Sequence, residues 1–347
     1  MPVARAAVNS LAAIDNLKVL ESAPLAAYTR FGIGGPAALL CDTASESAFV
    51  AALRMVKDSA MPAMVIGGGT NLIVSDAGFD GVVLRYTGAK IARSGLLLRM
   101  EAGAVLQDVV DHSIGLGLKG LQTMTGIPGY LGGAVYGNAG AYGHSIQELI
   151  EEVRFTDGTR ISSFTNDECQ FQYRDSIFKD RKAWVILSAS LRFEEGDRTE
   201  LSKVANEIRA IRDAKYPPAM RCAGSIFKNL LWAELPAVVR DELPAKVVRE
   251  RKVPSAWFLE QVGGKGIRRG DIQVAAYHAN LIYNDGAGTA ADLVAVIQEL
   301  KQRVFDRFGF ELEEEVQYVG FEYTATPRQK DPSGLLVRPE DPESVEK

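Results

Sequence analysis

The chain has 347 residues, of which 47% are hydrophobic and 24% are charged, and its formal net charge is −5. This composition is ordinary for a globular protein, and the length suggests two or three domains. The acidic balance argues against nucleic acid as the main partner, although a local basic pocket could still bind an anionic small molecule. No stretch of about 20 apolar residues occurs, so we expect no membrane-spanning helix.

Few residues are available for disulfides or metal sites. The cysteines stand at positions 41, 169 and 222, and the histidines at positions 112, 144 and 278. An odd number of widely spaced cysteines argues against a disulfide framework, and the histidines lack metal-ligand spacing, so we expect no bound metal. The N-terminus is a poor signal peptide, because Asn9 and Asp15 interrupt its apolar run. A reducing cytoplasm fits these features best.

The first predicted elements form a β-α-β unit. Residues 43–60 predict a helix, with a capping box of Thr43 and Glu46 ahead of an apolar stripe. The apolar runs at 64–67 and 81–86 predict short buried strands. Three consecutive glycines follow the first of these strands, at an edge where ligands often bind.

This first glycine loop, Gly67 to Gly69, differs from the dinucleotide fingerprint GxGxxG, since no helix pattern opens after it. Glycines in succession cost backbone entropy, so they need a reason. One reason is a backbone whose N–H groups must approach a phosphate. A tight turn between two strands is the alternative.

Further elements follow at regular intervals. The patterns predict strands over 95–103 and 183–194, a hairpin over 153–164 with its turn at Asp157-Gly158, and helices over 104–117, 200–214 and 289–309. In the second strand, Val185, Leu187, Ala189 and Leu191 alternate onto one face. Tyr216-Pro217-Pro218 ends the second helix, and we place a domain boundary there.

A second glycine segment spans residues 126–143, GIPGYLGGAVYGNAGAYG, with seven glycines in 18 positions. Close backbone contact with a flat, extended ligand would explain so little side-chain material. A flexible linker is the alternative, but the interspersed Ile127, Tyr130, Leu131 and Tyr136 are unusual in a linker. Together the two glycine segments suggest one large cofactor with a diphosphate.

Six motifs occur in order: YTRFGIGGPA (28–37), VIGGGTNLIVSD (65–76), the glycine segment at 126–143, YRDSIF (173–178), AGSIFKN (223–229) and LEEEV (312–316). Between about residues 20 and 320 the chain thus resembles the UDP-N-acetylenolpyruvoylglucosamine reductases, also called UDP-N-acetylmuramate dehydrogenases. The resemblance implies an α+β protein with an FAD-binding fold of the vanillyl-alcohol-oxidase (PCMH) type, made of two subdomains, and a C-terminal α+β substrate-binding domain. The implied divisions are an N-terminal extension (1–19), the FAD-binding domain (20–215, with subdomains near 20–77 and 78–215), the substrate-binding domain (216–323) and a disordered tail (324–347).

The resemblance also implies FAD as cofactor and NADPH as co-substrate. No histidine lies in the first glycine loop, so we expect noncovalent FAD. The implied cofactor-binding residues are Gly67, Gly68, Gly69, Thr70, Asn71 and Leu72 around the diphosphate, and Gly126, Ile127, Gly132, Gly133 and Ala134 along the ribityl chain and flavin.

The family reaction reduces UDP-N-acetylglucosamine enolpyruvate to UDP-N-acetylmuramate for peptidoglycan synthesis. Arg174 matches the family arginine, and its guanidinium can hold a carboxylate with two hydrogen bonds; a surface ion pair with Asp175 is the alternative. Ser225 matches the proton donor, where a turn serine is the alternative. Glu315 matches the third catalytic residue, but strand alternation by itself cannot choose between Glu313 and Glu315, and most acids of this stretch are expected on a solvated edge.

The resemblance assigns substrate contacts to Tyr173, Lys228, Asn229 and His278. The chain departs from the family pattern at Cys222 and Leu230, where we expect a polar residue and a proline. The short interval between Arg174 and Ser225 indicates the family type without the extra loop that closes over the substrate.

Two other functions stay open: a different flavoenzyme of the same fold that oxidises a hydroxy acid or sugar, and a non-catalytic regulator that binds nucleotide sugars. As partners we expect a small nucleotide sugar, and no nucleic acid, membrane insertion or obligate protein.

Overall fold

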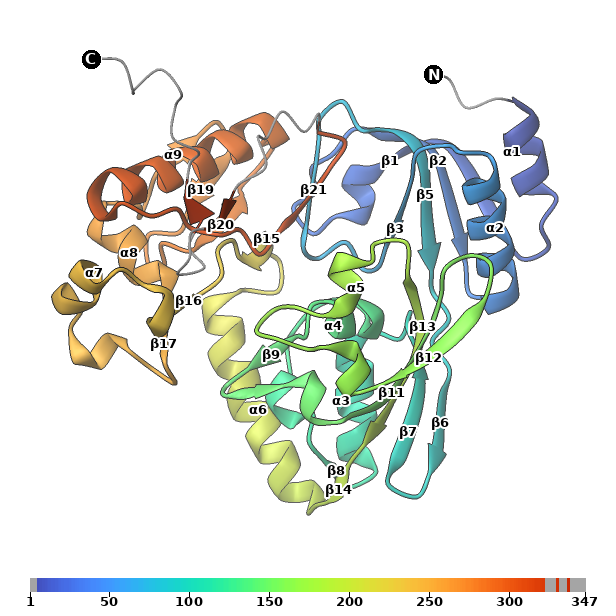
Figure 1. Cartoon of the computed structure of the whole chain (residues 1–347), viewed down its shortest axis with the longest axis horizontal. Coiled ribbons are helices and arrows are strands. Elements are labelled where there is room, and N and C mark those ends of the chain that lie inside the picture. Colours follow the sequence, from blue (N-terminus) through green and yellow to red (C-terminus); the bar gives the residue numbers. More distant parts are fainter. Residues whose placement is uncertain (1–4, 322–328, 331–335, 338–347) are drawn as a thin grey trace. The chain divides into compact units, whose positions relative to one another are not determined.

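The computed structural model describes residues 5–321, 329–330 and 336–337 (Figure 1). The chain divides into two compact units. The first unit comprises residues 1–29, 35–70 and 78–219, and the second comprises residues 30–34, 71–77 and 220–347. Both units combine helices with strands, which confirms the α+β class.

A four-stranded sheet with one covering helix begins the first unit. Its strands, in sheet order, are β1 (Lys18–Pro24), β2 (Pro36–Thr43), β5 (Phe79–Tyr86) and β3 (Ala63–Ile66). β2, β5 and β3 run parallel, while β1 is antiparallel to β2. Helix α2 (Glu46–Asp58) packs on β2 and β5 and buries Phe49, Ala52 and Val56, as its apolar stripe predicts.

The start of α2 differs from the predicted capping box. Ser45 is the N-cap, and its hydroxyl accepts a hydrogen bond from the Ala48 N–H at 3.3 Å. Thr43 instead donates to the Asn16 carbonyl at 2.6 Å and accepts from the Ser45 N–H at 3.0 Å. The carboxylate of Glu46 instead accepts hydrogen bonds from Arg154. The capping prediction was wrong because several polar residues competed for the cap, and tertiary contacts engaged two of them.

A five-stranded antiparallel sheet forms the rest of the first unit's core. Its strands, in sheet order, are β12 (Ile161–Thr165), β11 (Ile150–Thr156), β13 (Val185–Arg192), β7 (Leu97–Glu101) and β6 (Ile91–Ser94). Leu187, Ala189 and Leu191 are buried on one face of β13, and Ile186, Ser188 and Ser190 on its other face are buried as well. A central strand covered on both faces has no solvent side.

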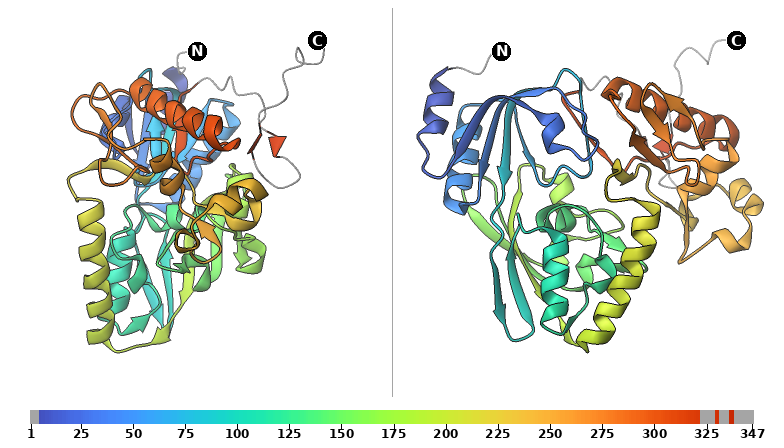
Figure 2. Two further views of the ribbon diagram at one scale, coloured as in Figure 1. Left: turned by 90° about the vertical axis from the view of Figure 1, so that its left-hand side faces the viewer. Right: turned by 180° about the vertical axis from the view of Figure 1, so that it is seen from behind.

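Helices cover one side of this sheet (Figure 2). They are α3 (Leu106–Gly115), α4 (Leu131–Tyr136) and α6 (Arg198–Lys215). Smaller elements complete the first unit: α1 (Arg5–Ala12), α5 (Ile177–Asp180), the pair β8 (Leu118–Lys119) and β14 (Glu194–Glu195), the pair β9 (Gly140–Ala141) and β10 (His144–Ser145), and the short 3-10 helices η1 (Leu25–Tyr28), η2 (Gln122–Met124), η3 (Ile146–Glu148) and η4 (Asp167–Cys169).

The predicted hairpin at Asp157-Gly158 joins β11 to β12. The Asp157 carboxylate accepts hydrogen bonds from the Thr159 hydroxyl at 2.6 Å and from the backbone N–H groups of Arg160 and Thr159 at 2.9 and 2.8 Å. These bonds favour the ionised form and hold the pKa of Asp157 well below its usual range. The side chain thus acts as an Asx-type brace of the turn.

An ion pair ties α2 to β11 across the first unit. Arg154 donates from its two terminal nitrogens to the two carboxylate oxygens of Glu46, at 2.9 and 2.7 Å. The hydrogen bonds from Arg154 lower the pKa of Glu46.

The sheet order suggests a different boundary between the two subdomains from the one predicted near residue 78. Strand β5 belongs to the same sheet as β2 and β3, so we propose that the first subdomain extends through Tyr86.

In its described residues, the second unit holds a four-stranded antiparallel sheet and three short strand pairs. Its sheet order is β15 (Arg221–Ser225), β20 (Leu281–Asn284), β19 (Ile272–Val274) and β18 (Arg268–Arg269). The other elements are the pair β16 (Leu230–Leu231) and β17 (Lys252–Val253), the parallel pair β4 (Leu72–Val74) and β21 (Gln317–Val319), helices α7 (Ala237–Glu242), α8 (Ser255–Gln261) and α9 (Ala290–Phe308), and the 3-10 helices η5 (Trp232–Glu234) and η6 (Ala245–Val247).

Helix α9 follows its sequence pattern closely. Its apolar stripe is buried, and Thr289 caps it by accepting from the Asp292 N–H at 3.1 Å. The carboxylate of Asp76 accepts from the N–H groups of Ala290 and Ala291 at 2.8 and 3.0 Å. A distant acidic residue therefore satisfies two more donors at the start of the helix.

Among the described residues, no helix combines the length and apolar character that crossing a membrane requires. Of the predicted disordered tail, the structure describes only β22 (Gln329–Lys330) and β23 (Leu336–Val337), which pair with each other. The other positions of residues 324–347 lie outside the described part of the chain.

The burial of the three cysteines predicts unreactive thiols. Cys41, Cys169 and Cys222 are at most 1% exposed, and burial raises the pKa of Cys41 to about 11 and that of Cys169 to about 12. Since only the thiolate is a good nucleophile, we expect Ellman's reagent to leave the native protein unmodified at about pH 8 and to modify all three thiols after denaturation. Rapid modification of any thiol in the native protein would contradict this burial.

Candidate functional site

The first glycine loop, Gly67 to Gly69, and the following Thr70 come directly after β3. Gly69 has a φ of +63°, and a Cβ at this position would overlap the carbonyl oxygen of Tyr28. Only glycine fits there, because both the backbone conformation and the space exclude a side chain. Among the described residues, none accepts a hydrogen bond from the backbone N–H of Gly68, Gly69 or Thr70. Three adjacent N–H donors of this kind suit a phosphate group.

The second glycine segment contacts the first. The Cα of Gly129 lies 3.1 Å from the position of a Cβ on Gly68, and the hydroxyl of Thr70 donates to the carbonyl of Pro128 at 3.3 Å. The ring of Tyr130 lies within 3.7 Å of Cβ positions built on Gly67 and Gly68. The structure thus brings together two segments that are far apart in the sequence, and their missing side chains permit the close approach.

Arg85 on β5 anchors Tyr130 beneath these loops. It donates to the Tyr130 hydroxyl at 2.7 Å, and its guanidinium carbon lies 5.2 Å from the Tyr28 ring and 5.7 Å from the Tyr130 ring. Asp42 on β2 pairs with it at 3.4 Å. Arg85 was not among the predicted site residues, although a lone arginine in the apolar run GVVLRY is a signal for a specific partner.

The glycine segment at 126–143 is more ordered than the sequence suggested. Its middle forms α4, and the backbone N–H groups of Gly126, Ile127, Gly132 and Ala134 all bind acceptors within the protein. Gly132 is explained by packing, since its Cβ would lie 2.9 Å from that of Ala102. Gly133 has no such explanation, because no atom outside its own helix lies within 4 Å of a Cβ placed there. A helical glycine that faces open space fits close approach by a ligand.

Arg174 lies in a tight turn of the first unit. Gln172 and Asp175 exchange two backbone hydrogen bonds of 3.1 Å, and Arg174 between them has a φ of +57°. Its guanidinium donates to the carbonyl of Gly140 at 2.8 Å and lies 5.4 Å from the Tyr173 ring. The Asp175 carboxylate accepts from the Ser176 N–H at 2.9 Å. These contacts hold the Arg174 guanidinium against the Gly140 carbonyl and the Tyr173 ring, and so favour a positioned arginine over a surface ion pair with Asp175.

Ser225 ends β15 in the second unit. It follows Gly224, whose φ is +74°, and it pairs with Leu281 after a bulge in the ladder. The buried Asn280 holds the next two residues: its side-chain oxygen accepts from the N–H groups of Ile226 and Phe227 at 3.1 and 2.9 Å. The half-buried Ser225 is therefore on a rigid strand end rather than a loose turn.

Glu315 lies beside this strand end. Its backbone N–H donates to the carbonyl of Ile226 at 2.7 Å, and its own carbonyl accepts from the amide of Asn71 at 2.8 Å. The second unit thus places Glu315 opposite the residue that follows Ser225. Asn71 and Leu72, which the sequence assigned to the cofactor, belong to this unit; Leu72 starts β4 and pairs with Gln317.

The neighbouring acids have separate partners. The carboxylate of Glu313 binds the ammonium group of Lys228 at 2.5 Å, and that of Glu314 binds Lys301 at 2.9 Å. The Lys301 side chain is 3% exposed and also lies 3.8 Å from Glu311. The expected solvated edge was therefore wrong for Glu311 and Glu314, which neutralise a buried lysine. The predicted alternation separates Glu314 from Glu313 and Glu315, although these residues precede β21 and do not form a strand.

The remaining predicted substrate residues are also placed. Tyr173 stacks near Arg174 in the first unit, while Lys228, Asn229 and His278 belong to the second. Asn229 is exposed and accepts weakly from the Ser255 N–H at 3.4 Å. The Nδ1 of His278 accepts from the Asn280 N–H at 3.2 Å, so a neutral His278 ring carries its proton on Nε2. Within the described ranges, no group of three or more His, Cys, Asp or Glu side chains is arranged to hold a metal ion.

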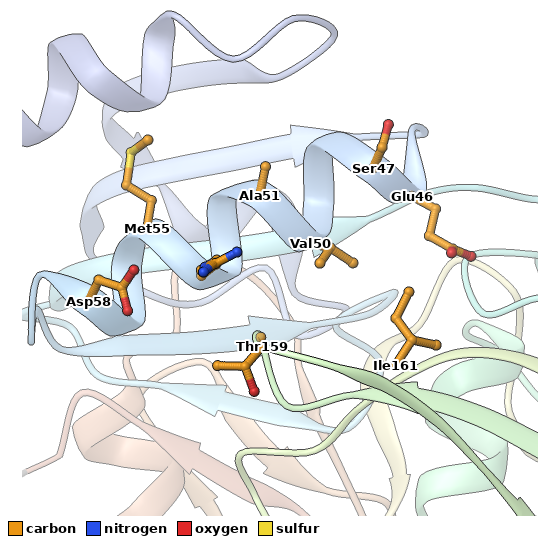
Figure 3. A pocket seen from close by; sticks show the side chains of 10 residues that line it. Glu46, Ser47, Val50, Ala51, Met55, Asp58, Thr159 and Ile161 are labelled. Carbon is orange, nitrogen blue, oxygen red and sulfur yellow. The ribbon is translucent and has the colours of Figure 1, made fainter.

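A separate open groove of about 680 Å³ lies between α2 and the β11–β12 hairpin (Figure 3). Val50, Met55 and Ile161 supply apolar lining, and Glu46 and Asp58 stand at its ends. It contains none of the predicted site residues.

Comparisons with known proteins agree with the motifs. The family model described as FAD binding domain matches residues 37–159, and the model of the UDP-N-acetylenolpyruvoylglucosamine reductase C-terminal domain matches residues 216–319. The chain is 57% identical over 310 residues to the UDP-N-acetylenolpyruvoylglucosamine reductase of Solibacter usitatus, covering 89% of this chain and 99% of the relative. The chain belongs to the UDP-N-acetylenolpyruvoylglucosamine reductase family.

Other relatives support the same family. The reductase of Rubrobacter xylanophilus is 35% identical over 86% of this chain and 94% of its own. The solved reductase of Thermus caldophilus is 27% identical, with a TM-score of 0.67 over 87% of this chain and 98% of that one. The resemblance, the FAD-binding fold and FAD as the cofactor of this reductase family member are thereby confirmed.

Two glycines with nearly equal φ angles test the first loop. Gly69 (+63°) meets the Tyr28 carbonyl, whereas Gly95 (+61°) has open space around it. Alanine at either position costs ~1–2 kcal/mol of backbone strain, but only Gly69→Ala forces the loop away from Tyr28. We expect Gly95→Ala to retain FAD after purification and Gly69→Ala to lose most of it, as measured by flavin absorbance per protein. Equal FAD contents in the two variants would contradict the loop's role.

The buried Lys301 gives a second prediction. Lys301→Met leaves Glu311 and Glu314 without their buried cation and should lower the free energy of unfolding by ~3–5 kcal/mol. Lys119→Met is the control, because the side chains of the Lys119–Glu194 pair are 53% and 75% exposed; it should cost less than ~1 kcal/mol. Denaturant unfolding measures both, and similar losses would argue against the buried network.

Proposed function

We propose that this protein reduces UDP-N-acetylglucosamine enolpyruvate to UDP-N-acetylmuramate, with NADPH as hydride source, as a step of peptidoglycan precursor synthesis. The observation that carries the proposal is the 57% identity to a reductase of this name over 99% of that relative's length. The substrate is a small nucleotide sugar. A cytoplasmic location suits three buried free thiols.

The cofactor FAD supplies hydride transfer between NADPH and the substrate. The residues proposed to hold its diphosphate are those of the first glycine loop, supported by the N–H groups of Gly68 to Thr70. Gly126, Ile127, Gly132, Gly133 and Ala134 are proposed to lie along the ribityl chain and flavin. The open space at Gly133 supports this assignment, whereas Gly126, Ile127, Gly132 and Ala134 can contribute only close approach, since their N–H groups are already bonded.

Arg174 is proposed to clamp the substrate carboxylate. Negative charge grows there when hydride adds to the methylene carbon of the vinyl group, and a preorganised guanidinium stabilises this charge. The carbonyl of Gly140 accepts from one terminal nitrogen, and the guanidinium lies over the neighbouring Tyr173 ring. An arginine so restrained loses little further freedom when it binds a carboxylate.

Ser225 is proposed to donate the proton to the carbon next to the carboxylate, and Glu315 to assist it. Hydride on one vinyl carbon and a proton on the other complete the saturated ether. A serine hydroxyl is a weak acid, so a nearby carboxyl that shares a hydrogen bond or orients water is needed. The backbone bond from Glu315 to Ile226 supports this pairing.

Lys228, Asn229 and His278 are proposed to contact the rest of the substrate. Lys228 already pairs with Glu313, so its charge toward a diphosphate is partly compensated. The neutral His278 ring offers an Nε2–H donor. Arg174 and Ser225 stand 225 − 174 = 51 residues apart, which supports the family type without the additional substrate-closing loop.

Separate half-reactions test the proton donor. We expect the purified protein to be yellow and to bleach anaerobically with NADPH, and UDP-N-acetylglucosamine enolpyruvate to restore the colour. Ser225→Ala should bleach at the normal rate but regain colour at least ~100-fold more slowly, because a general acid contributes about that much or more. Ser163→Ala, on the exposed part of β12, is the control.

Three results would overturn parts of this proposal. Normal recolouring of Ser225→Ala would remove Ser225 from proton donation. Oxygen consumption with a hydroxy acid or sugar, without any response to the enolpyruvyl substrate, would favour the alternative oxidase. A colourless protein that binds the nucleotide sugar would favour the regulator.

A further inference from the structure

The Arg174 turn is held in a conformation that its own sequence does not favour. A non-glycine residue with φ near +57° costs ~1–2 kcal/mol relative to the right-handed regions, so surrounding contacts must impose it. Lys179 contributes one such contact, from its ammonium group to the Arg174 carbonyl at 2.5 Å. The guanidinium itself is held from elsewhere.

The holding segment is the second half of the glycine segment, Tyr136 to Gly140. Three of its alternate residues bind the turn at three points. The Tyr136 carbonyl accepts from the Ser176 hydroxyl at 2.7 Å, and the Asn138 side-chain amide donates to the Gln172 carbonyl at 2.7 Å. The Gly140 carbonyl accepts from the Arg174 guanidinium at 2.8 Å. Both ends of the turn and its arginine are thereby fixed to one short stretch.

Asn138 is the centre of this arrangement. It is 3% exposed and has a φ of +43°, a conformation that asparagine tolerates better than most residues. Its amide nitrogen also donates to the side chain of Gln147 at 2.9 Å, and its amide oxygen accepts from the Gln147 N–H at 3.3 Å. Its backbone carbonyl lies 3.5 Å from the second terminal nitrogen of Arg174.

The direction of the Gly140 carbonyl is fixed as well. Gly140 opens the β9–β10 hairpin and pairs with Ser145. The two residues at its tip, Tyr142 and Gly143, have φ angles of +53° and +82°. Two successive left-handed residues form the tight two-residue turn that best suits a hairpin. Arg174 therefore donates to a carbonyl whose direction is set by the short β9–β10 hairpin.

We infer that Asn138 is a positioning residue for Arg174: its buried amide sets the turn so that the guanidinium points at the substrate carboxylate. This inference rests on the proposed role of Arg174 as the carboxylate clamp. The glycine segment then serves two purposes: residues up to Ala134 are proposed to face the cofactor, and residues Tyr136 to Gly140 hold the arginine.

Two substitutions remove this function in different ways. Asn138→Gly permits the φ of +43° and deletes the amide. Asn138→Asp keeps the size but places an oxygen against the Gln172 carbonyl, where a donor is required. Asn166→Ala is the matched control, because Asn166 donates to the carbonyls of Gln147 and Ile150 at 2.6 and 2.8 Å in the same unit without binding the turn.

The expected result separates positioning from general stability. All three variants should retain FAD and bleach with NADPH within about twofold of the parent rate. Both Asn138 variants should recolour with the enolpyruvyl substrate at least ~10-fold more slowly, since small misplacements of a catalytic group are costly. Asn166→Ala should recolour normally, and normal recolouring of the Asn138 variants would overturn the inference.

A double-mutant cycle with Arg174→Lys identifies the route of the effect. If Asn138 acts through Arg174, Asn138→Gly should change the recolouring rate by less than about twofold in the Arg174→Lys background. A full, additive effect in that background would reject the positioning role. Unchanged recolouring of Arg174→Lys alone would instead reject the proposed clamp, so the two failures are distinguishable. Should Asn138→Gly lose FAD or melt early, Asn138→Asp in the same cycle provides the measurement.

Discussion

The site of the first unit depends on one constraint: the glycine loop at Gly67 to Gly69 must lie directly against the backbone at Gly129 and at Tyr28. The Cα of Gly129 lies almost against Gly68, and Gly69 fits against the Tyr28 carbonyl only because it has no Cβ. This contact leaves three N–H groups of the first loop available for an anion. The ring of Tyr130, held by Arg85 on β5, supports the contact from below. A Cβ on Gly69 would overlap the Tyr28 carbonyl, and a Cβ on Gly68 would crowd Gly129, so side chains at these positions would displace the first loop before any ligand binds.

In the second glycine segment, the stretch Tyr136 to Gly140 shows how backbone groups can form a site for a charged side chain. Carbonyls at Tyr136 and Gly140, together with the amide of Asn138, bind the turn that carries Arg174. Carbonyl oxygens are good partners for a guanidinium, because they orient it without neutralising its charge. An acidic partner in the same place would compete with a substrate carboxylate.

In the second unit, three successive acids just before β21 have three different environments. Glu313 pairs with Lys228, Glu314 pairs with the buried Lys301, and Glu315 is tied through its backbone to the strand end beside Ser225. Successive side chains point in different directions, and the neighbouring lysines give the first two acids structural partners. The backbone of Glu315 is bonded to Ile226, the residue after the proposed proton donor, where a carboxyl able to exchange hydrogen bonds is useful.

Periodicity and motif order were enough to predict the helices α2, α6 and α9, the hairpin at Asp157, the two glycine segments and the family. These features are local, because one face of an element or one turn depends on residues only a few positions apart. The tertiary structure decided the rest: the contacts of Thr43 with Asn16 and of Glu46 with Arg154, the burial of Glu311 and Glu314 around Lys301, the support of Tyr130 by Arg85, and the hold of Asn138 on the Arg174 turn. Each joins residues whose separation in the chain carries no signal of contact, so only the folded chain could show which partner a polar side chain selects.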